Sequence, residues 1–224
     1  MKYLWNFILS LKEIIIVFFI QYFILILSII VFGVSRSYYI GTILIMVFDI
    51  LFIIFNMKRI DISFNDKNNY FPYILLGLSI SIIYNMLLYK YGIYSYQDYD
   101  ISILLIVVAS SIVGPIFEEI LFRYLFIVKL EKFISNKWVI IFLSSFIFAI
   151  AHSNFLSLII AFFIGIINGY IFIKTRDVIK ISLVHIFVNL VSSFLYQYNY
   201  YIFIIGICLF IISLLCFWKK KQGF

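Results

Sequence analysis

The sequence predicts an all-α fold, a polytopic bundle of about eight transmembrane helices with both termini on the cytoplasmic side. Of the 224 residues, 66% are hydrophobic and only 12% are charged, whereas soluble domains are nearer half apolar and a quarter charged. Apolar runs long enough to cross a bilayer recur from end to end. The polar stretches between them are too short to form a soluble domain. We therefore expect a single integral membrane domain over residues 1–224.

Eight apolar segments are the expected spans. The first follows Lys12 and lacks the small-residue cleavage site of a signal peptide, so we expect it to be retained. The fourth contains Gly114 and Pro115, a pair that predicts a kink or a break in that helix. The expected spans are residues 13–34, 38–57, 71–90, 101–128, 137–153, 155–174, 178–197 and 199–218.

The basic residues predict the orientation. With both termini inside, the inner segments hold 14 of the 17 Lys and Arg residues, the outer segments hold only Arg36 and Lys90, and Arg123 lies within a span. This asymmetry follows the positive-inside rule, and an even number of spans also puts both termini on one side. The inner basic residues are Lys2, Lys12, Lys58, Arg59, Lys67, Lys129, Lys132, Lys137, Lys174, Arg176, Lys180, Lys219, Lys220 and Lys221.

The net charge of +7 does not indicate a nucleic-acid partner, because the charges lie in short clusters between apolar runs. Such clusters are typical of loops at a membrane surface. The abundance of Ile, Phe, Tyr, Asn and Lys suggests an AT-rich genome, and we expect a bacterial plasma membrane. The partner expected from composition is the lipid bilayer.

The stretch GPIFEEILFR, residues 114–123, places two adjacent glutamates and an arginine inside the fourth expected span. Glu119 and Arg123 are four residues apart, on one helix face and in the favourable acid-first order. Because an unpaired arginine in a bilayer is costly, we expect these two to neutralise each other. Glu118 points about 100° away from this pair, and a carboxylate there can serve as a general base for water. From this motif alone, an ion pair that only fixes helix packing is an equal alternative.

The only two histidines of the chain favour a shared polar site. Phe148 and His152 are four residues apart, as are His185 and Asn189, so each pair projects from one helix face. A single histidine on an apolar face is more often a packing residue. Two of them, with a glutamate pair on a third helix, are harder to explain by packing. Asp49, a further intramembrane carboxyl, is expected to be hydrogen-bonded to another helix, with a supporting role as the alternative.

Three motifs in this order, E-E-x-x-x-R, F-x-x-x-H and H-x-x-x-N, resemble the CAAX prenyl protease and bacteriocin-processing (CPBP, or Abi) family of intramembrane proteases. Here they read EEILFR (118–123), FAIAH (148–152) and HIFVN (185–189). The resemblance covers about residues 100–195, which would be the catalytic core. It implies hydrolysis of a peptide bond in a membrane-associated or hydrophobic peptide, such as a bacteriocin precursor, a pheromone or a leader peptide. It also suggests bacteriocin self-immunity as a physiological role.

The resemblance also implies roles for the motif residues. Glu118 and His152 would activate a water molecule, and His185 with Asn189 would stabilise the oxyanion. We favour a mechanism without a metal cofactor. The alternative is a catalytic zinc held by Glu118, His152 and His185 with water in the fourth position. Asparagine is a poor zinc ligand, and the sequence has no H-E-x-x-H helix.

Glu119 and Arg123 would be structural or substrate-orienting in such an enzyme. Tyr124 departs from the family pattern, in which glycine commonly follows the arginine, and a bulkier residue there would narrow the substrate groove. Two other classes of function remain open from the sequence. One is a proton-coupled transporter or channel that uses the Glu/His cluster as a relay. The other is a non-catalytic membrane immunity or scaffold protein.

Overall fold

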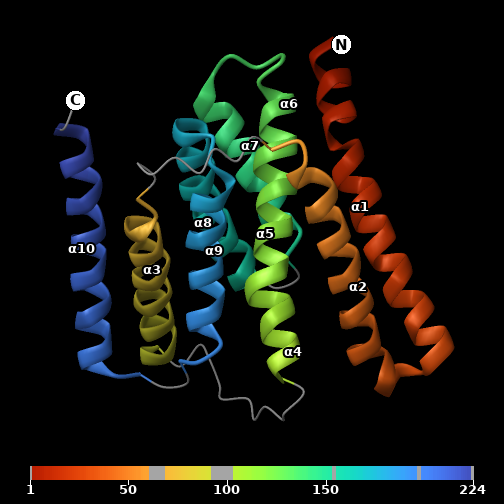
Figure 1. Cartoon of the computed structure of the whole chain (residues 1–224), viewed down its shortest axis with the longest axis horizontal. Helices are drawn as coiled ribbons and strands as arrows, with labels where there is room; N and C mark the ends of the chain where they lie inside the picture. Colours follow the sequence, from red (N-terminus) through yellow and green to blue (C-terminus); the bar gives the residue numbers. More distant parts are fainter. Residues whose placement is uncertain (1, 61–68, 92–102, 153–154, 196–197, 223–224) are drawn as a thin grey trace. The chain divides into compact units, whose positions relative to one another are not determined.

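The computed structural model describes residues 2–60, 69–91, 103–152, 155–195 and 198–222, and all regular elements in these ranges are helices (Figure 1). The predicted all-α fold is therefore confirmed. Contacts divide the chain into two compact units. Unit 1 is Met1–Asp61 with Ile116–Val178, and unit 2 is Ile62–Pro115 with Ile179–Phe224.

Within the described residues, six helices are long and apolar enough to cross a membrane, and two further apolar helices are shorter. The short ones are α7 (Lys137–Ile150, 14 residues) and α9 (Val178–Ser192, 15 residues). At about 1.5 Å per residue they cover roughly 21–22 Å, less than the roughly 30 Å of a hydrocarbon core. The predicted polytopic membrane architecture is confirmed, but the spans predicted at 137–153 and 178–197 are longer than α7 and α9.

The end of α7 shows why hydropathy overestimates it. The backbone N–H groups of Ala151 and His152 bond to carbonyls three residues back, those of Phe148 and Ala149, which tightens and closes the helix. The polar residues His152, Ser153 and Asn154 follow, and the expected span extended into this polar segment. The expected span ends at residues 153 and 197 lie outside the described residues, as does Lys67.

In unit 1, α1 (Lys2–Phe32) and α2 (Val34–Met57) lie side by side as a helical hairpin (Figure 1). The connection is Gly33, whose φ of 76° suits a residue without a Cβ. Gln21 donates from Nε2 to Oδ1 of Asp49 at 2.8 Å, so a polar bond ties the two helices within an apolar surrounding. Helix α1 begins well before the predicted residue 13, because the residues ahead of Lys12 are also apolar.

Also in unit 1, α7 packs on α8 (Phe155–Thr175) through small residues. A Cβ on Gly165 would meet the Cβ of Ser145 at 2.9 Å, so only glycine permits this approach. The start of α7 is fixed by Asn136, whose side chain accepts from the backbone N–H of Trp138 at 2.9 Å. Small residues and a side-chain cap thus define this hairpin.

In unit 2, α3 (Phe71–Lys90) is flanked by α9 and by α10 (Tyr200–Gln222). A Cβ on Gly77 would meet the Val184 carbonyl oxygen of α9 at 2.5 Å. The Ser81 hydroxyl of α3 donates to the Val188 carbonyl oxygen of α9 at 2.7 Å. Close backbone approach and interhelical hydrogen bonds therefore hold α9 against α3.

Residues 103–130 form one uninterrupted series of helical elements, so the expected break at Gly114 and Pro115 is absent, whereas the expected kink stays a prediction. The hydrogen bonding instead widens to the π-helical pattern on both sides of this pair, and the Gly114 N–H bonds to Ala109, five residues back. Turns of π-helix are frequent at functional sites. The elements are α4 (Ile103–Val108), η1 (Ala109–Val113), α5 (Gly114–Glu119), η2 (Ile120–Ile127) and α6 (Val128–Leu130).

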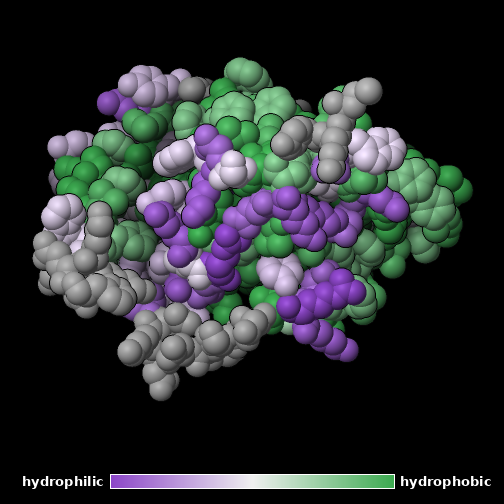
Figure 2. All heavy atoms as spheres, turned by 90° about the horizontal axis from the view of Figure 1, so that it is seen from above, coloured by the Kyte–Doolittle hydropathy of each residue, from purple (hydrophilic) through white to green (hydrophobic). Residues whose placement is uncertain are grey.

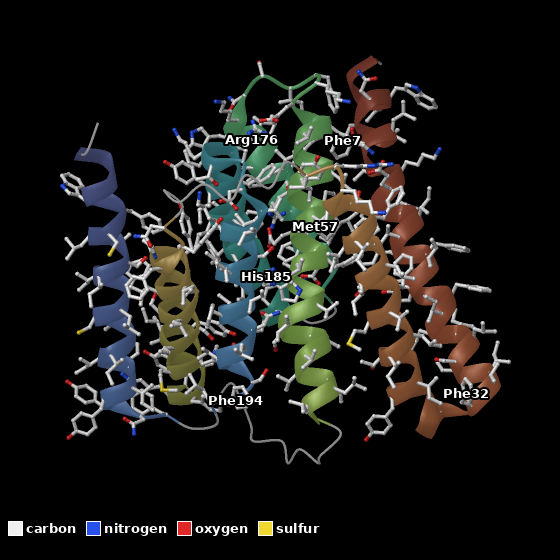
Figure 3. All side chains as sticks on the ribbon, viewed as in Figure 1. Phe7, Phe32, Met57, Arg176, His185 and Phe194 are labelled. Atoms are coloured by element: carbon white, nitrogen blue, oxygen red, sulfur yellow. The ribbon has the colours of Figure 1, made fainter. Side chains whose placement is uncertain are left out.

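One end of unit 1 carries hydrophilic side chains at its surface. Phe7 and Arg176 lie toward one end of this unit and Phe32 toward the other (Figure 3). The view onto the end with Arg176 shows hydrophilic side chains, in purple, among hydrophobic ones in green (Figure 2). There Arg176 makes two hydrogen bonds with Glu131, at 2.5 and 2.7 Å, which raise the pKa of the guanidinium.

Candidate active site

The Glu119–Arg123 ion pair predicted from the spacing is present and entirely buried. Arg123 Nε lies 3.2 Å from Glu119 Oε2, and both side chains are 0% exposed. Asn168 of α8 donates from Nδ2 to Glu119 Oε1 at 2.9 Å. Arg123 donates from Nη1 to the Ser144 hydroxyl of α7 at 3.0 Å. Because a buried ion pair is favourable only when further hydrogen bonds surround it, these contacts are what make the pair tolerable.

The pair therefore joins three helical elements of unit 1. Ser144 in turn donates to the Phe122 carbonyl at 2.9 Å, so α7 is bonded to η2 twice. The sequence interpretation did not include Asn168 or Ser144. Each is a polar residue inside an apolar run, and this is the feature by which the sequence could have identified it as a candidate. Their partners could not be identified from sequence, since Asn168 is 49 residues from Glu119.

Glu118 differs from its neighbour Glu119 in that it is half-buried, whereas Glu119 is fully buried. Its carboxyl interacts electrostatically with Arg123 and with Asp49 of α2. Asp49 is buried and holds the hydrogen bond from Gln21, so the expected interhelical bond of this residue is present. Glu118 thus lies within electrostatic range of a buried cation on one side and of a second carboxyl group on another helix.

His152 follows the last turn of α7 and is held by the phenylalanine of its own motif. Its Nδ1 lies 3.2 Å from the Phe148 carbonyl oxygen, and the two rings meet edge to face at 5.0 Å. A carbonyl oxygen can only accept, so this bond requires the proton on Nδ1. The lone pair is then on Nε2, which is the form that can act as a base.

Phe148 also connects the first two motifs. Its ring lies under the Arg123 guanidinium, with Cζ 4.8 Å from the ring centre, in the range of a cation–π contact. The F-x-x-x-H motif therefore has a physical reason: Phe148 supports the buried arginine with its ring and fixes the His152 tautomer with its carbonyl group.

The third motif lies on α9 in unit 2, where His185 is buried about midway along the helix (Figure 3). Asn189, one turn further, donates from Nδ2 to the Ser110 carbonyl of η1 at 3.1 Å. In a π-helix that carbonyl would accept from residue 115, but Pro115 has no N–H. The side chain of Asn189 supplies the missing donor. An amide nitrogen carries two N–H groups, so this bond uses only one of them.

Tyr124, the departure from the family pattern, donates its hydroxyl to the Arg59 carbonyl at 2.8 Å. Arg59 follows α2, so Tyr124 ties the end of that helix to η2 within unit 1. The side chain thus has a structural contact of its own. Whether it also shapes a substrate path is a separate prediction.

Within the part of the chain that the structure describes, no three His, Cys, Asp or Glu side chains are grouped suitably for an ion. Unit 1 contributes only Glu118 and His152 of the three candidates, and His185 belongs to unit 2. Zinc binding by these three residues therefore stays a prediction.

The comparisons with known proteins give one match. Residues 100–191 match a family model described as type II CAAX prenyl endopeptidase Rce1-like. No curated protein and no solved structure matches the chain. The matched segment contains all three motifs, from Glu118 to Asn189, and agrees with the range over which the motifs resemble the family. Over residues 100–191 the chain is therefore similar to the type II CAAX prenyl endopeptidases.

Proposed function

We propose that this protein is an intramembrane endopeptidase that hydrolyses a peptide bond in a hydrophobic or membrane-associated peptide. The observation that carries the proposal is the match of residues 100–191 to a CAAX endopeptidase model, because that segment holds Glu118, His152, His185 and Asn189. The geometry of unit 1 supports it. Glu119 is fully buried, forms an ion pair with Arg123 and accepts a hydrogen bond from Asn168, whereas Glu118 beside it is half-buried.

In the proposed reaction, Glu118 takes a proton from a water molecule while the water oxygen attacks the carbonyl carbon of the peptide bond. His152 orients this water through Nε2, because its Nδ1–H is held by the Phe148 carbonyl. His185 and the second N–H of Asn189 donate to the oxyanion of the tetrahedral intermediate. When the intermediate collapses, the C–N bond breaks and the proton passes from Glu118 to the leaving amine.

Water must reach this chemistry at membrane depth, and the lengths of two helices favour such access. Helices α7 and α9 carry the two histidine motifs and are both shorter than a bilayer core. Non-helical backbone at that depth is tolerated only where it is buried in protein or faces water. His152, which follows α7, is therefore in a setting that suits hydrolysis.

The substrate class we propose is a small hydrophobic peptide such as a bacteriocin precursor, a pheromone or a leader peptide, with self-immunity as a possible physiological outcome. Zinc dependence would require Glu118, His152 and His185 as ligands. The test is chelation: we expect activity to survive it. Activity that is lost on chelation and restored by zinc would instead establish the metal mechanism.

The function is tested with purified protein, a panel of hydrophobic peptides and three variants, Glu118→Ala, His152→Ala and His185→Ala. Cleavage that disappears in each variant while the folded state persists supports the endopeptidase. Cleavage that survives Glu118→Ala contradicts the proposed mechanism. If no peptide is cut but a cellular phenotype still depends on these residues, a proton relay or a non-catalytic immunity role replaces the proposal.

A further inference from the structure

A cavity unrelated to the motif residues opens in unit 1 where α1 begins and α6 ends. It has a volume of about 350 Å³. Its wall combines two lysines and two uncharged polar residues with two apolar side chains. The lining residues are Asn6, Leu9 and Ser10 of α1, Lys129 of α6, and Lys132 and Phe133 of the following turn.

The position of the wall is well defined by packing. Phe7 of α1 and the buried Phe126 of η2 have ring centres 6.4 Å apart. In the sequence, Phe7 follows the lining residue Asn6, and Phe126 lies three residues before the lining residue Lys129. Lys129 Nζ lies 2.6 Å from Oε1 of Glu13, so α6 and α1 are joined by an ion pair as well. The cavity is therefore a feature of two packed helices rather than of a loose terminus.

The charge of the cavity is positive. Lys129 and Lys132 both line it, and Glu13, which pairs with Lys129, does not. An ammonium group has three N–H donors, so the bond to Glu13 leaves Lys129 with donors for another acceptor. Lys132 is exposed and forms no ion pair with an acid among the described residues. Ser10 already donates its hydroxyl to the Asn6 carbonyl at 2.8 Å, and the amide of Asn6 adds a further donor.

The depth of the cavity corresponds to the headgroup layer. The part of α1 without charged residues runs from Ile14 to Phe32, about 19 residues or roughly 28 Å, which matches the hydrocarbon thickness of about 30 Å. The lining residues of α1 lie one to two turns before Ile14. They carry exposed apolar neighbours, since Trp5 is 61% and Leu9 48% exposed, as expected of a membrane interface.

We propose that this cavity binds the phosphate headgroup of an anionic phospholipid of the inner leaflet. The two ammonium groups and the Asn6 amide engage the phosphate, and Leu9 and Phe133 contact the glycerol and the first acyl carbons. Basic pockets between membrane helices on the cytoplasmic side suit such headgroups. The apolar residues beside the lysines favour a lipid over a free phosphate, which would leave them without a partner. The bound lipid would hold α1 against α6.

The test is native mass spectrometry of the full-length protein in a neutral detergent, titrated with dioleoyl phosphatidylglycerol or with dioleoyl phosphatidylcholine. We expect one phosphatidylglycerol to bind saturably and more tightly than phosphatidylcholine. Each of the variants Lys129→Gln and Lys132→Gln should weaken that binding about fivefold. Lys137→Gln, at the same end of unit 1 but outside the cavity, is the matched control and should bind as the wild type does.

Glu13→Gln separates the cavity from the ion pair. It removes the acid that competes for Lys129, so phosphatidylglycerol binding should be retained or tightened; its loss would mean that the ion pair itself, and not the cavity, governs binding. Equal binding of phosphatidylcholine, or wild-type binding by Lys132→Gln, would overturn the proposal. Competition by glycerol phosphate at equal concentration would show a site for free phosphate. Displacement by a peptide carboxylate but not by its amide would show a peptide site instead.

Discussion

Replacing Glu119 by glutamine is predicted to destabilise the protein strongly, because it leaves the Arg123 guanidinium buried without its ion-pair partner. Both side chains are 0% exposed. Removing one member of a buried pair costs about 3–5 kcal/mol. For a chain of this length, 1 kcal/mol corresponds to roughly 2–4 °C in Tm, so a decrease of about 10 °C is expected. The hydrogen bond of Arg123 to Ser144 and its cation–π contact with Phe148 remain, but they do not neutralise the guanidinium.

The double variant Glu119→Gln/Arg123→Met makes this prediction specific. It removes both charges at similar side-chain volume, and such replacements are often neutral or even stabilising. We therefore expect the double variant to unfold at a higher temperature than Glu119→Gln alone. Thermal unfolding in detergent, followed by tryptophan fluorescence, measures all three proteins. The reasoning is refuted if Glu119→Gln unfolds within about 1 kcal/mol of the wild type, or if the double variant is less stable than the single one.

Three further changes have outcomes that differ in kind. Gly77→Ala places a methyl group 2.5 Å from a carbonyl of α9, so a loss of about 1–3 kcal/mol is expected in thermal unfolding; an unchanged Tm contradicts the close packing. Pro115→Ala restores an N–H that can bond to Ser110 and compete with Asn189, so peptide cleavage should fall while Tm is kept or raised; full activity would count against this role. Glu131→Gln breaks a pair that is partly exposed, and its cost should stay below about 1 kcal/mol; a larger decrease in stability would be evidence for a tighter structural role.

Much of the fold could be predicted because the membrane simplifies the sequence signal. The span 71–90 coincides with α3, Phe71–Lys90, since charged or polar residues bound it on both sides. The span 178–197 was too long, because α9 ends at Ser192 without a glycine or a charge to mark the stop. Hydropathy identifies what is compatible with lipid, whereas hydrogen bonding determines where a helix ends.

The candidate site was predictable only where its partners are close in sequence. The Glu119–Arg123 pair follows from helical periodicity alone. Asn168 reaches Glu119 only through the packing of α8, which the sequence does not encode locally. The bond of Asn189 to the Ser110 carbonyl likewise depends on a π-helical turn before Pro115. Such a turn has no recognised signal in a single sequence.

The measurement that tests the central claim most directly is the rate of peptide cleavage by Glu118→Gln, compared with the wild type in the same lipid. The substitution keeps the shape of the side chain and removes only its ability to accept a proton as a carboxylate. Loss of a general base is expected to lower kcat/KM by about 10²–10⁴-fold. Because Glu118 is half-buried whereas Glu119 and Arg123 are fully buried, Tm should fall less than in Glu119→Gln. Cleavage at the wild-type rate by a folded Glu118→Gln protein would contradict the account.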